Sequence, residues 1–354
     1  MKILVVCPEL HRLGGVANHY RGLHEHWKFD VNYSFYGKRK DNSSKFLTIL
    51  LYPIDFLTYI WKLIFHAPDV VIVNPSFRTF QLVRDGIYLL AARLLRIPVV
   101  TFIHGFDVKL KDNLTEYGKN ILSWTYNKST FIYVLSLEFK RSLESINITA
   151  PIMLTTTKVS ESLLEGFVFQ PKEKIKTLLF VARVIKDKGI YEAIDSLRII
   201  QKSYPYVRLM VVGEGEELKY VKHYVSDQKI SGVDFMGSLS GKSLADCYQM
   251  GDIYLLPTRS EGMATTILEA MAFGLPVITT PVGGVVDFFE NGKNGFFIED
   301  YDPEKYADIV MDLIDSPDKI SKISKRNFLY AKENFIASKV VAKFEKDITD
   351  YLKQ

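Results

Sequence analysis

The strongest constraint on the fold of this chain of 354 residues is a regular alternation of short apolar runs with segments of helical periodicity. In the first half the runs are Ile3–Cys7, Val31–Phe35, Val70–Asn74, Val99–His104, Phe131–Ser136 and Ile152–Thr155. Unbroken apolar strands separated by helical segments are typical of a parallel sheet that is covered on both faces. We therefore predict an α/β fold with a parallel sheet for this half.

The second half repeats this rhythm. Its expected strands are Thr177–Ala182, Val207–Val212, Val233–Met236, Ile253–Leu256, Pro276–Thr280 and Gly295–Ile298. Its expected helices are Ile190–Gln201, Leu218–Gln228, Ser243–Met250, Thr266–Phe273, Pro303–Asp315 and Pro317–Asn334. Because single cores rarely grow beyond ~250–300 residues, the length favours two doubly wound domains, joined near residues 155–175. Ala337–Leu352 has an amphipathic pattern and is expected to form a helix that caps either domain.

Composition narrows the class of protein. A hydrophobic content of 47% and a charged content of 24% are typical of globular proteins, and the net charge is only +4. There is no concentrated basic stripe with interleaved aromatics, which argues against nucleic-acid binding. Cys7 and Cys247 lack metal-ligand spacing and are expected to be free thiols in a reducing compartment. The apolar run at the N-terminus is too short for a signal peptide, so we expect a cytoplasmic protein.

The stretch Arg259–Pro276 carries the most specific pattern. Glu261 is expected in a loop after a buried strand, and Glu269 about one turn into the following helix, which Gly274 would end as a left-handed cap. The small residues between the two carboxylates would present the unpaired N–H groups of a helix start, where a phosphate is favoured. Two alternatives stay open: Thr266 and Glu269 also fit a capping box, and Glu261 fits a solvated loop acid.

Further candidates follow other strands, at the edge where open α/β sheets bind ligands. Gly14-Gly15 precedes a helix and is either a ligand-approach loop or a simple tight turn. His104 can hydrogen-bond a hydroxyl or be a structural histidine, and Asp107 can be a helix N-cap.

In the second half, Arg183 and Lys188 suit the binding of a diphosphate, with Lys186 as a rival for the second role and a charged surface turn as the alternative. Gly213 allows a tight turn beside a nucleobase or ribose, and Met236 lies where it can line the same pocket.

Phe46–Phe65 is apolar nearly all round and approaches the ~20 residues that span a bilayer, but Pro53, Asp55 and Lys62 interrupt it. We reject a spanning helix. Two interpretations stay open: a buried helix pair, or an apolar face at a membrane surface with Lys38–Lys40 nearby.

Together these loops make the chain similar to retaining glycosyltransferases of the GT-B fold, in the large family 4. The resemblance rests on Glu261-x7-Glu269 and is supported by Arg183 with Lys188-Gly189, Val212-Gly-x-Gly215, Gly14-Gly15-Val16 and His104-Gly105. It implies two Rossmann-like domains that face a central cleft. Residues 1–160, with helix 337–354 packing back, would bind the acceptor, and residues 161–336 would bind the nucleotide-sugar donor.

The resemblance also implies the roles of single residues. The catalytic residues would be His104, Arg183, Lys188 and Glu261. The donor-binding residues would be Gly14, Gly15, Gly213, Met236, Gly262, Met263, Ala264, Thr265 and Glu269. Two departures are Ala182, where a glycine is usual, and Leu154–Lys158, which lacks the common Asn-Gly.

The implied activity is transfer of a sugar, with retained configuration, from a UDP- or GDP-sugar to a hydroxyl acceptor. The acceptor would be lipid-linked or a growing glycan of the cell surface, reached from the cytoplasm or from the inner face of the membrane. No cofactor or metal is expected, because no Asp-x-Asp motif is present where a metal would be needed. A sugar-nucleotide epimerase and a catalytically silent nucleotide-sugar-binding protein are the alternatives. The sequence leaves the oligomeric state open.

Overall fold

A computed structural model describes residues 1–12, 14–37, 45–77, 79–106 and 114–353. Asp107 and Lys38–Lys40 lie outside these residues. The chain divides into two compact units, each of which has its own sheet. Unit 1 comprises Met1–Lys158 with Ala337–Gln354, and unit 2 comprises Val159–Ile336. The division lies two residues before the boundary expected from the sequence.

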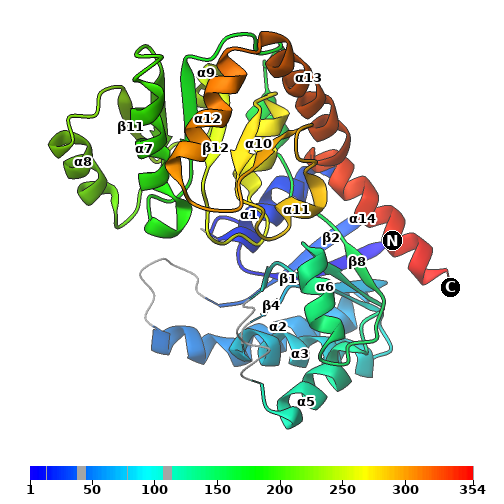
Figure 1. Cartoon of the computed structure of the whole chain (residues 1–354). Coiled ribbons are helices and arrows are strands. Elements are labelled where there is room, and N and C mark those ends of the chain that lie inside the picture. Colours follow the sequence, from blue (N-terminus) through cyan, green and yellow to red (C-terminus); the bar gives the residue numbers. More distant parts are fainter. Residues whose placement is uncertain (13, 38–44, 78, 107–113, 354) are drawn as a thin grey trace. The chain divides into compact units, whose positions relative to one another are not determined.

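Unit 1 is built on a parallel six-stranded sheet with the order β2-β1-β3-β5-β7-β8 (Figure 1). Its strands are β1 (Lys2–Cys7), β2 (Asp30–Phe35), β3 (Val70–Val73), β5 (Val99–Ile103), β7 (Phe131–Val134) and β8 (Ile152–Leu154). The central strands β3, β5 and β7 are buried along their whole length, as expected for apolar strands covered on both faces. The strands expected in this half are therefore confirmed.

The helices of unit 1 are α1 (Gly15–Leu23), α2 (Lys45–Phe65), α3 (Thr79–Leu94), α5 (Glu116–Tyr126), α6 (Leu137–Glu144) and α14 (Ala337–Leu352). A 3₁₀ turn, η1 (His24–His26), follows α1. Side-chain caps begin two of these helices, because the hydroxyl of Thr115 accepts from the N–H of Gly118 and that of Ser136 accepts from Phe139. A small pair, β4 (Ser76–Phe77) and β6 (Gly105–Phe106), was not expected.

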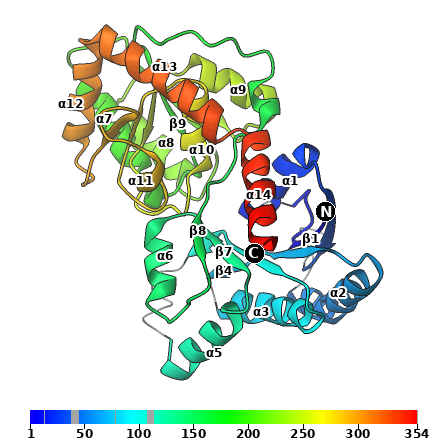
Figure 2. The same ribbon diagram turned by 90° about the vertical axis from the view of Figure 1, so that its right-hand side faces the viewer.

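The C-terminal helix α14 completes the core of unit 1 (Figure 2). The ring of Phe344 is stacked on Tyr133, with centroids 4.7 Å apart, and meets Phe102 edge-on. Glu345 accepts hydrogen bonds from the backbone N–H groups of Lys28 and Phe29 at 2.6 and 2.9 Å. The amphipathic face predicted from the sequence is thus buried against residues that are more than 200 positions away in the chain.

Helix α2 corrects one expectation. Residues 45–65 form one helix that continues through Pro53, and not a buried helix pair. Two of its charged side chains point inward: Asp55 accepts from the N–H of Gly37, and Lys62 donates to Asn32 and to the carbonyl of Tyr33. Its outward positions carry apolar side chains, of which Leu57 is 67% exposed.

Unit 2 repeats the plan with a parallel sheet of the order β11-β10-β9-β12-β13-β14. The strands are β9 (Thr177–Val181), β10 (Arg208–Val212), β11 (Val233–Gly237), β12 (Ile253–Leu256), β13 (Val277–Thr279) and β14 (Gly295–Phe297). All of the strands expected in the second half are confirmed within one or two residues at each end.

The helices of unit 2 are α7 (Ile190–Ile200), α8 (Leu218–Asp227), α9 (Gly241–Met250), α10 (Thr265–Ala272), α11 (Val285–Phe288), α12 (Pro303–Ile314) and α13 (Pro317–Asn334). Two 3₁₀ turns, η2 (Glu161–Leu164) and η3 (Lys186–Lys188), complete the unit. Its two ends meet, since the N–H of Val159 donates to the carbonyl of Phe335 at 2.7 Å and Val159 bridges Ile336. Unit 2 is therefore a continuous segment whose entry and exit lie side by side.

Candidate functional site

In unit 2 the structure brings Lys188 and Glu261 into contact at the carboxyl edge of the sheet. Lys188, at the end of η3 after β9, places its Nζ 2.5 Å from Oε1 of Glu261, in the loop after β12. The same ammonium donates to the carbonyl of Ser260 at 2.9 Å. Both side chains are only 13% and 15% exposed, so water screens the pair weakly. From the sequence we expected Lys188 to bind a phosphate, which stays a prediction. In the structure its ammonium is bonded to Glu261.

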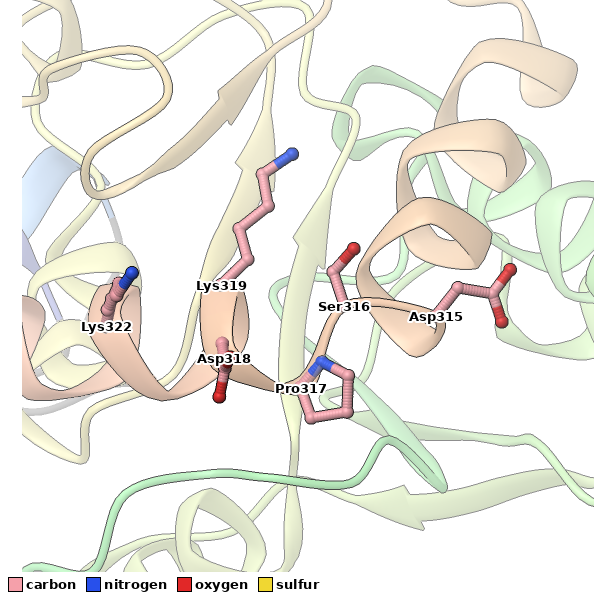
Figure 3. Close-up of a pocket in the computed structure, with 6 residues that line it drawn as sticks. All are labelled: Asp315, Ser316, Pro317, Asp318, Lys319 and Lys322. Carbon is pink, nitrogen blue, oxygen red and sulfur yellow. The ribbon is translucent and has the colours of Figure 1, made fainter.

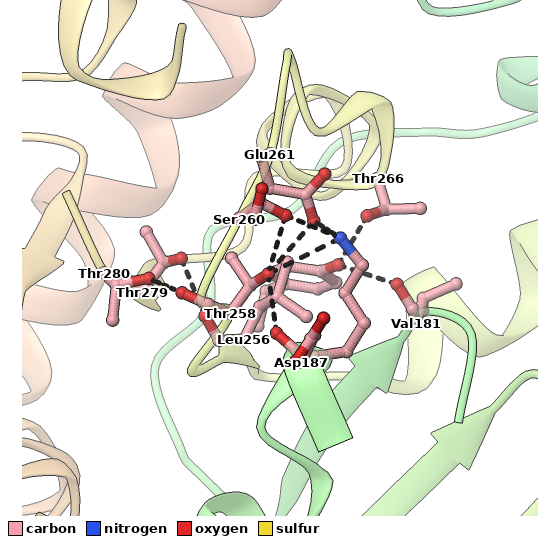
Figure 4. Close-up of polar contacts among 11 residues, drawn as sticks. Val181, Asp187, Leu256, Thr258, Ser260, Glu261, Thr266, Thr279 and Thr280 are labelled. Atoms are coloured by element: carbon pink, nitrogen blue, oxygen red, sulfur yellow. Dashed lines mark hydrogen bonds and ion pairs between the residues drawn. The ribbon is translucent and has the colours of Figure 1, made fainter. Parts of the chain in front are cut away.

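Thr258 anchors this loop, as Figure 4 shows. Its buried hydroxyl lies 3.3 Å from the carbonyls of Asp187 and Ser260 and 3.4 Å from Oε1 of Glu261. Its own carbonyl accepts from the hydroxyl of Thr280, which follows β13. The loop that carries Glu261 is thus hydrogen-bonded to the turn η3, which follows β9, and to the end of β13.

Glu269 lies in the second turn of α10 and is held by a tyrosine from α9. The hydroxyl of Tyr248 donates to Oε2 of Glu269 at 2.8 Å. Burial, followed by the neighbouring Glu269 carboxylate, raises the pKa of Tyr248 well above its usual value, so this hydroxyl keeps its proton.

One of the two open alternatives, a capping box with Thr266 as the N-cap, is not formed. The helix begins one residue earlier, with Ala264 as N-cap and no side-chain cap bond. The hydroxyl of Thr266 instead accepts a hydrogen bond from Tyr254 at 2.7 Å. The left-handed cap at Gly274 is present, with φ of 75°.

Arg183 has a different environment from Lys188. Its side chain is exposed and makes no hydrogen bond or ion pair with any residue that the structure describes. Lys186, the rival for the second cationic role, is 73% exposed and lies 3.8 Å from Glu217. One guanidinium is therefore left available at this edge, while one ammonium is already bound to a carboxylate.

The other donor-binding candidates of unit 2 also follow strands at this edge. Met263 and Ala264 are buried, and Gly262 and Thr265 flank them at the start of α10, where the first N–H groups of a helix lack intrahelical acceptors. Met236, near the end of β11, is 40% exposed. Gly213 has φ of 139°, and a Cβ there would lie 1.9 Å from the carbonyl oxygen of Ala182, so close backbone packing alone requires this glycine.

In unit 1, His104 belongs to a buried polar cluster at the carboxyl ends of β1, β3 and β5. The amide of Asn74 donates to the carbonyl of Val6 at 2.9 Å, which fixes the direction of its oxygen. That oxygen accepts from the hydroxyl of Tyr20 at 2.8 Å and lies 3.0 Å from Nε2 of His104. An amide oxygen only accepts, so Nε2 of His104 carries the proton and Nδ1 is an acceptor.

The environment of His104 keeps its ring neutral. Burial lowers the pKa of His104 to about 3. The residue as a whole is partly accessible, but its ring packs 3.8 Å from the ring of Phe102 and 5.0 Å from that of His19, counted between centroids. Gly14 and Gly15 stand at the start of α1, with open space where a Cβ would be.

Sequence reasoning missed Thr258, Asn74 and Tyr248. Asn74 ended an expected strand and Tyr248 lay in an expected helix, and neither belonged to a motif. Their partners, His104 and Glu269, are 30 and 21 positions away, so only the folded chain brings them together.

A separate surface hollow of unit 2 lies at the turn between α12 and α13 (Figure 3). It is lined by Asp315, Ser316, Pro317, Asp318, Lys319 and Lys322, and none of the expected site residues is among them. Among the described residues, no helix combines the length and the apolar character that crossing a membrane requires.

The sequence of the chain is similar to sequences of known proteins. Residues 165–329 match the family described as Glycosyl transferases group 1. The chain is 25% identical to the uncharacterized glycosyltransferase MJ1069 of Methanocaldococcus jannaschii, over 97% of each chain. It is 31% identical to the spore coat protein SA of Bacillus subtilis over 49% of each, about half the length of that relative.

A third relative is the capsular polysaccharide biosynthesis glycosyltransferase CapM of Staphylococcus aureus, with 28% identity over 49% of this chain and 46% of CapM. Among solved structures, Anabaena Alr3699/HepE in complex with UDP superposes with a TM-score of 0.74 at 16% identity, over 99% of this chain and 100% of that one. This likeness extends over both units and shows their fold.

Proposed function

We propose that this chain, a glycosyltransferase with the GT-B fold and a group 1 domain at residues 165–329, moves a sugar from a nucleotide-diphosphate sugar to a hydroxyl acceptor with retained configuration. The observation that carries the proposal is the arrangement of Arg183, Lys188 and Glu261 at one edge of unit 2. Two cations suit a diphosphate, and a fixed carboxylate suits the hydroxyls of a sugar.

Each of these groups has a role in the proposed reaction. Arg183 and Lys188 stabilise the negative charge that develops on the leaving diphosphate, and the N–H groups at the start of α10 add a helix terminus. Oε1 of Glu261 is bound to Lys188, and its Oε2 has no partner among the described residues. Oε2 is therefore available to accept a hydrogen bond from a sugar hydroxyl. Glu269, fixed by Tyr248, would accept from the ribose.

The bonds change in one step. The bond between the anomeric carbon and the phosphate oxygen breaks, and its electron pair stays on that oxygen. The acceptor oxygen bonds to the anomeric carbon on the same face, and the acceptor proton goes to the leaving phosphate oxygen. Neutral His104 has an acceptor at Nδ1 and would hydrogen-bond a hydroxyl of the sugar.

Similar proteins guide the proposed substrates. The HepE structure holds UDP, which supports a UDP-sugar as donor ahead of a GDP-sugar. CapM acts in capsular polysaccharide biosynthesis, which supports a lipid-linked or growing cell-surface glycan as acceptor. We propose that unit 2 binds the donor and unit 1 the acceptor. The reaction as written needs no metal and no cofactor, and such an enzyme would work in the cytoplasm or at the inner face of the membrane.

The test is the variant Arg183→Ala. Because Arg183 is exposed and makes no hydrogen bond or ion pair with a described residue, we expect an unchanged melting temperature and a loss of turnover of about 10²–10³-fold. Transfer is measured with UDP-sugars and a membrane extract, and UDP binding is measured by calorimetry.

Arg198→Ala on α7 is the matched control, because Arg198 is also exposed and its contacts, with Asp195 and Gln228, do not involve any residue of the proposed site. Unchanged turnover in Arg183→Ala would contradict the assigned role. Donor consumption that needs no acceptor would instead indicate an epimerase, and donor binding without product would indicate a silent binding protein.

A further inference from the structure

Helices α2 and α3 of unit 1 hold Asp55, Lys62, Arg84 and Asp85 against the protein, while many of their apolar side chains are exposed. On α2, Ile54, Leu57, Trp61, Ile64 and Phe65 are all at least half exposed. Asp55 and Lys62 on the same helix are instead bonded to the protein. This is the reverse of the usual arrangement of a surface helix, in which the apolar stripe faces the core.

Helix α3 repeats the pattern. Phe80, Val83, Ile87 and Leu94 are exposed, and Leu94 reaches 84%. The charged pair of this helix, Arg84 with Asp85, lies inside at 2.7 Å, where Asp85 is fully buried. Within residues 51–65 of α2 and residues 80–94 of α3, therefore, no carboxylate is exposed.

The apolar positions belong to one continuous face. The hydroxyl of Tyr59 on α2 donates to the carbonyl of Tyr88 on α3, and the hydroxyl of Tyr126 on α5 donates to the carbonyl of Leu82 on α3. Figures 1 and 2 both show α2 beside α3. Helix α2 connects β2 to β3, α3 connects β3 to β5, and α5 connects β5 to β7, and all three connections run in the same direction along the sheet. Because such connections between parallel strands are right-handed, the three helices lie on the same face of the sheet.

A groove on this face combines apolar and cationic groups. It is lined by Ile87 and Leu94 of α3, Trp124 of α5, and the cations Arg93 and Lys128. The ammonium of Lys128 lies 4.4 Å from the ring centroid of Trp124, which is itself 59% exposed. Tryptophan beside lysine or arginine is typical of the boundary between lipid headgroups and acyl chains.

We propose that the exposed faces of α2, α3 and α5 form a docking surface for an anionic lipid bilayer. Trp61, Leu57 and Leu94 enter the headgroup boundary, while Arg93 and Lys128 bind lipid phosphates. A contiguous group of exposed large apolar side chains is typical of an interaction surface, whereas single exposed apolar residues are ordinary on a monomer. A second copy of this chain fits less well, because a symmetric interface would bring Arg93 and Lys128 of both copies together.

Vesicle flotation of the full chain tests this surface without any sugar donor, so it does not depend on the proposed transfer reaction. We expect binding to vesicles of phosphatidylcholine with a quarter of phosphatidylglycerol, and weaker binding to phosphatidylcholine alone. Trp61→Glu should lower binding roughly tenfold or more, since it removes an inserted aromatic group. Replacing Arg93 and Lys128 by glutamine should lower binding about fivefold per charge, on the anionic vesicles only.

The matched control is Tyr220→Glu on α8 of unit 2, because Tyr220 is a large aromatic residue with 66% exposure. This variant should bind vesicles like the unaltered chain. Both Trp61 and Tyr220 are exposed, so circular dichroism and the melting temperature should not change. Equal flotation of Trp61→Glu and Tyr220→Glu would overturn the proposal. Absence of flotation of the unaltered chain would also overturn the proposal. If light scattering then shows a dimer that Trp61→Glu dissociates, this surface binds a second copy of the chain and not a bilayer.

Discussion

His19 and His104 show how burial sets the chemistry of single side chains. Neither ring nitrogen of His19 has a hydrogen-bond partner among the described residues, and its ring packs edge-on against Tyr20, Phe102 and His104. Burial first, then the charges of His104 and Lys158, lower the pKa of His19 well below its usual value. Both histidines are therefore neutral in the folded protein at physiological pH.

This neutrality predicts a loss of stability in acid. Below about pH 6.5 an unfolded chain binds protons at these histidines, whereas the folded chain does not until the pH approaches about 3 for His104. The free energy of unfolding should therefore fall as the pH drops through this window, by up to about 1.4 kcal/mol per pH unit for each histidine. His19→Phe should reduce this slope in urea unfolding measured from pH 7 to pH 4.

The control is His223→Phe, because His223 is 78% exposed on α8. Its slope should match that of the unaltered chain. If His19→Phe leaves the slope unchanged as well, the buried histidines are not the groups that couple stability to pH.

At the scale of elements, the turn η3 shows what a close approach of two backbones demands. Gly189 follows Lys188 with φ of 73°, and a Cβ there would lie 2.1 Å from the carbonyl oxygen of Pro257 at the end of β12. This approach sets how closely the Lys188 turn lies to the strand that leads to Glu261. Gly166 has a nearly identical φ of 72° but open space around the same position.

Alanine substitutions at Gly166 and Gly189 distinguish the effect of backbone strain on stability from that of a steric conflict. Gly166→Ala should cost about 1–2 kcal/mol, the usual penalty of a left-handed conformation. Gly189→Ala should cost that amount and several kcal/mol more, because the Pro257 carbonyl is backbone and cannot turn away. Chemical denaturation measures both. Equal costs would show that the η3 turn relaxes away from β12.

Elements were also what the sequence predicted best. The strands of both sheets and the helices from 190 to 352 follow from apolar periodicity and from Pro and Gly at their ends, which are local signals. The small β4–β6 pair is too short to have a period. The contacts of Lys188 with Glu261, 73 positions apart, and of Tyr248 with Glu269 depend on tertiary packing, which leaves no pattern in one chain. The outward face of α2 was one of two open interpretations, because periodicity does not tell which side of an apolar helix meets solvent.

At the scale of the whole molecule, unit 1 depends on residues from both ends of the chain. Phe344 is buried in α14 beneath Tyr133, Phe102 and Trp27, and Val340 and Ile348 flank it on the same face. Without α14 the residues of the sheet that it covers would meet water.

Phe344→Ala should therefore destabilise unit 1 by about 3–5 kcal/mol, as for other large-to-small changes in a core. Hydrogen exchange should become faster at the amides of β1, β5 and β7. Leu329→Ala is the control, because Leu329 is 48% exposed on α13, and it should change stability by less than about 0.5 kcal/mol. Unaltered exchange in β5 and β7 would show that α14 is not part of the core.

The pairing of Val159 with Phe335 and Ile336 makes unit 2 an insertion in the architecture of unit 1. Because the two ends of unit 2 are hydrogen-bonded neighbours, they are as close together as the two ends of a tight turn. Unit 2 can therefore be excised as one continuous piece, with Lys158 and Ala337 rejoined by a short linker, or transplanted into a surface loop of another protein. The same geometry makes residues 159 and 336 natural places to open the chain for circular permutation.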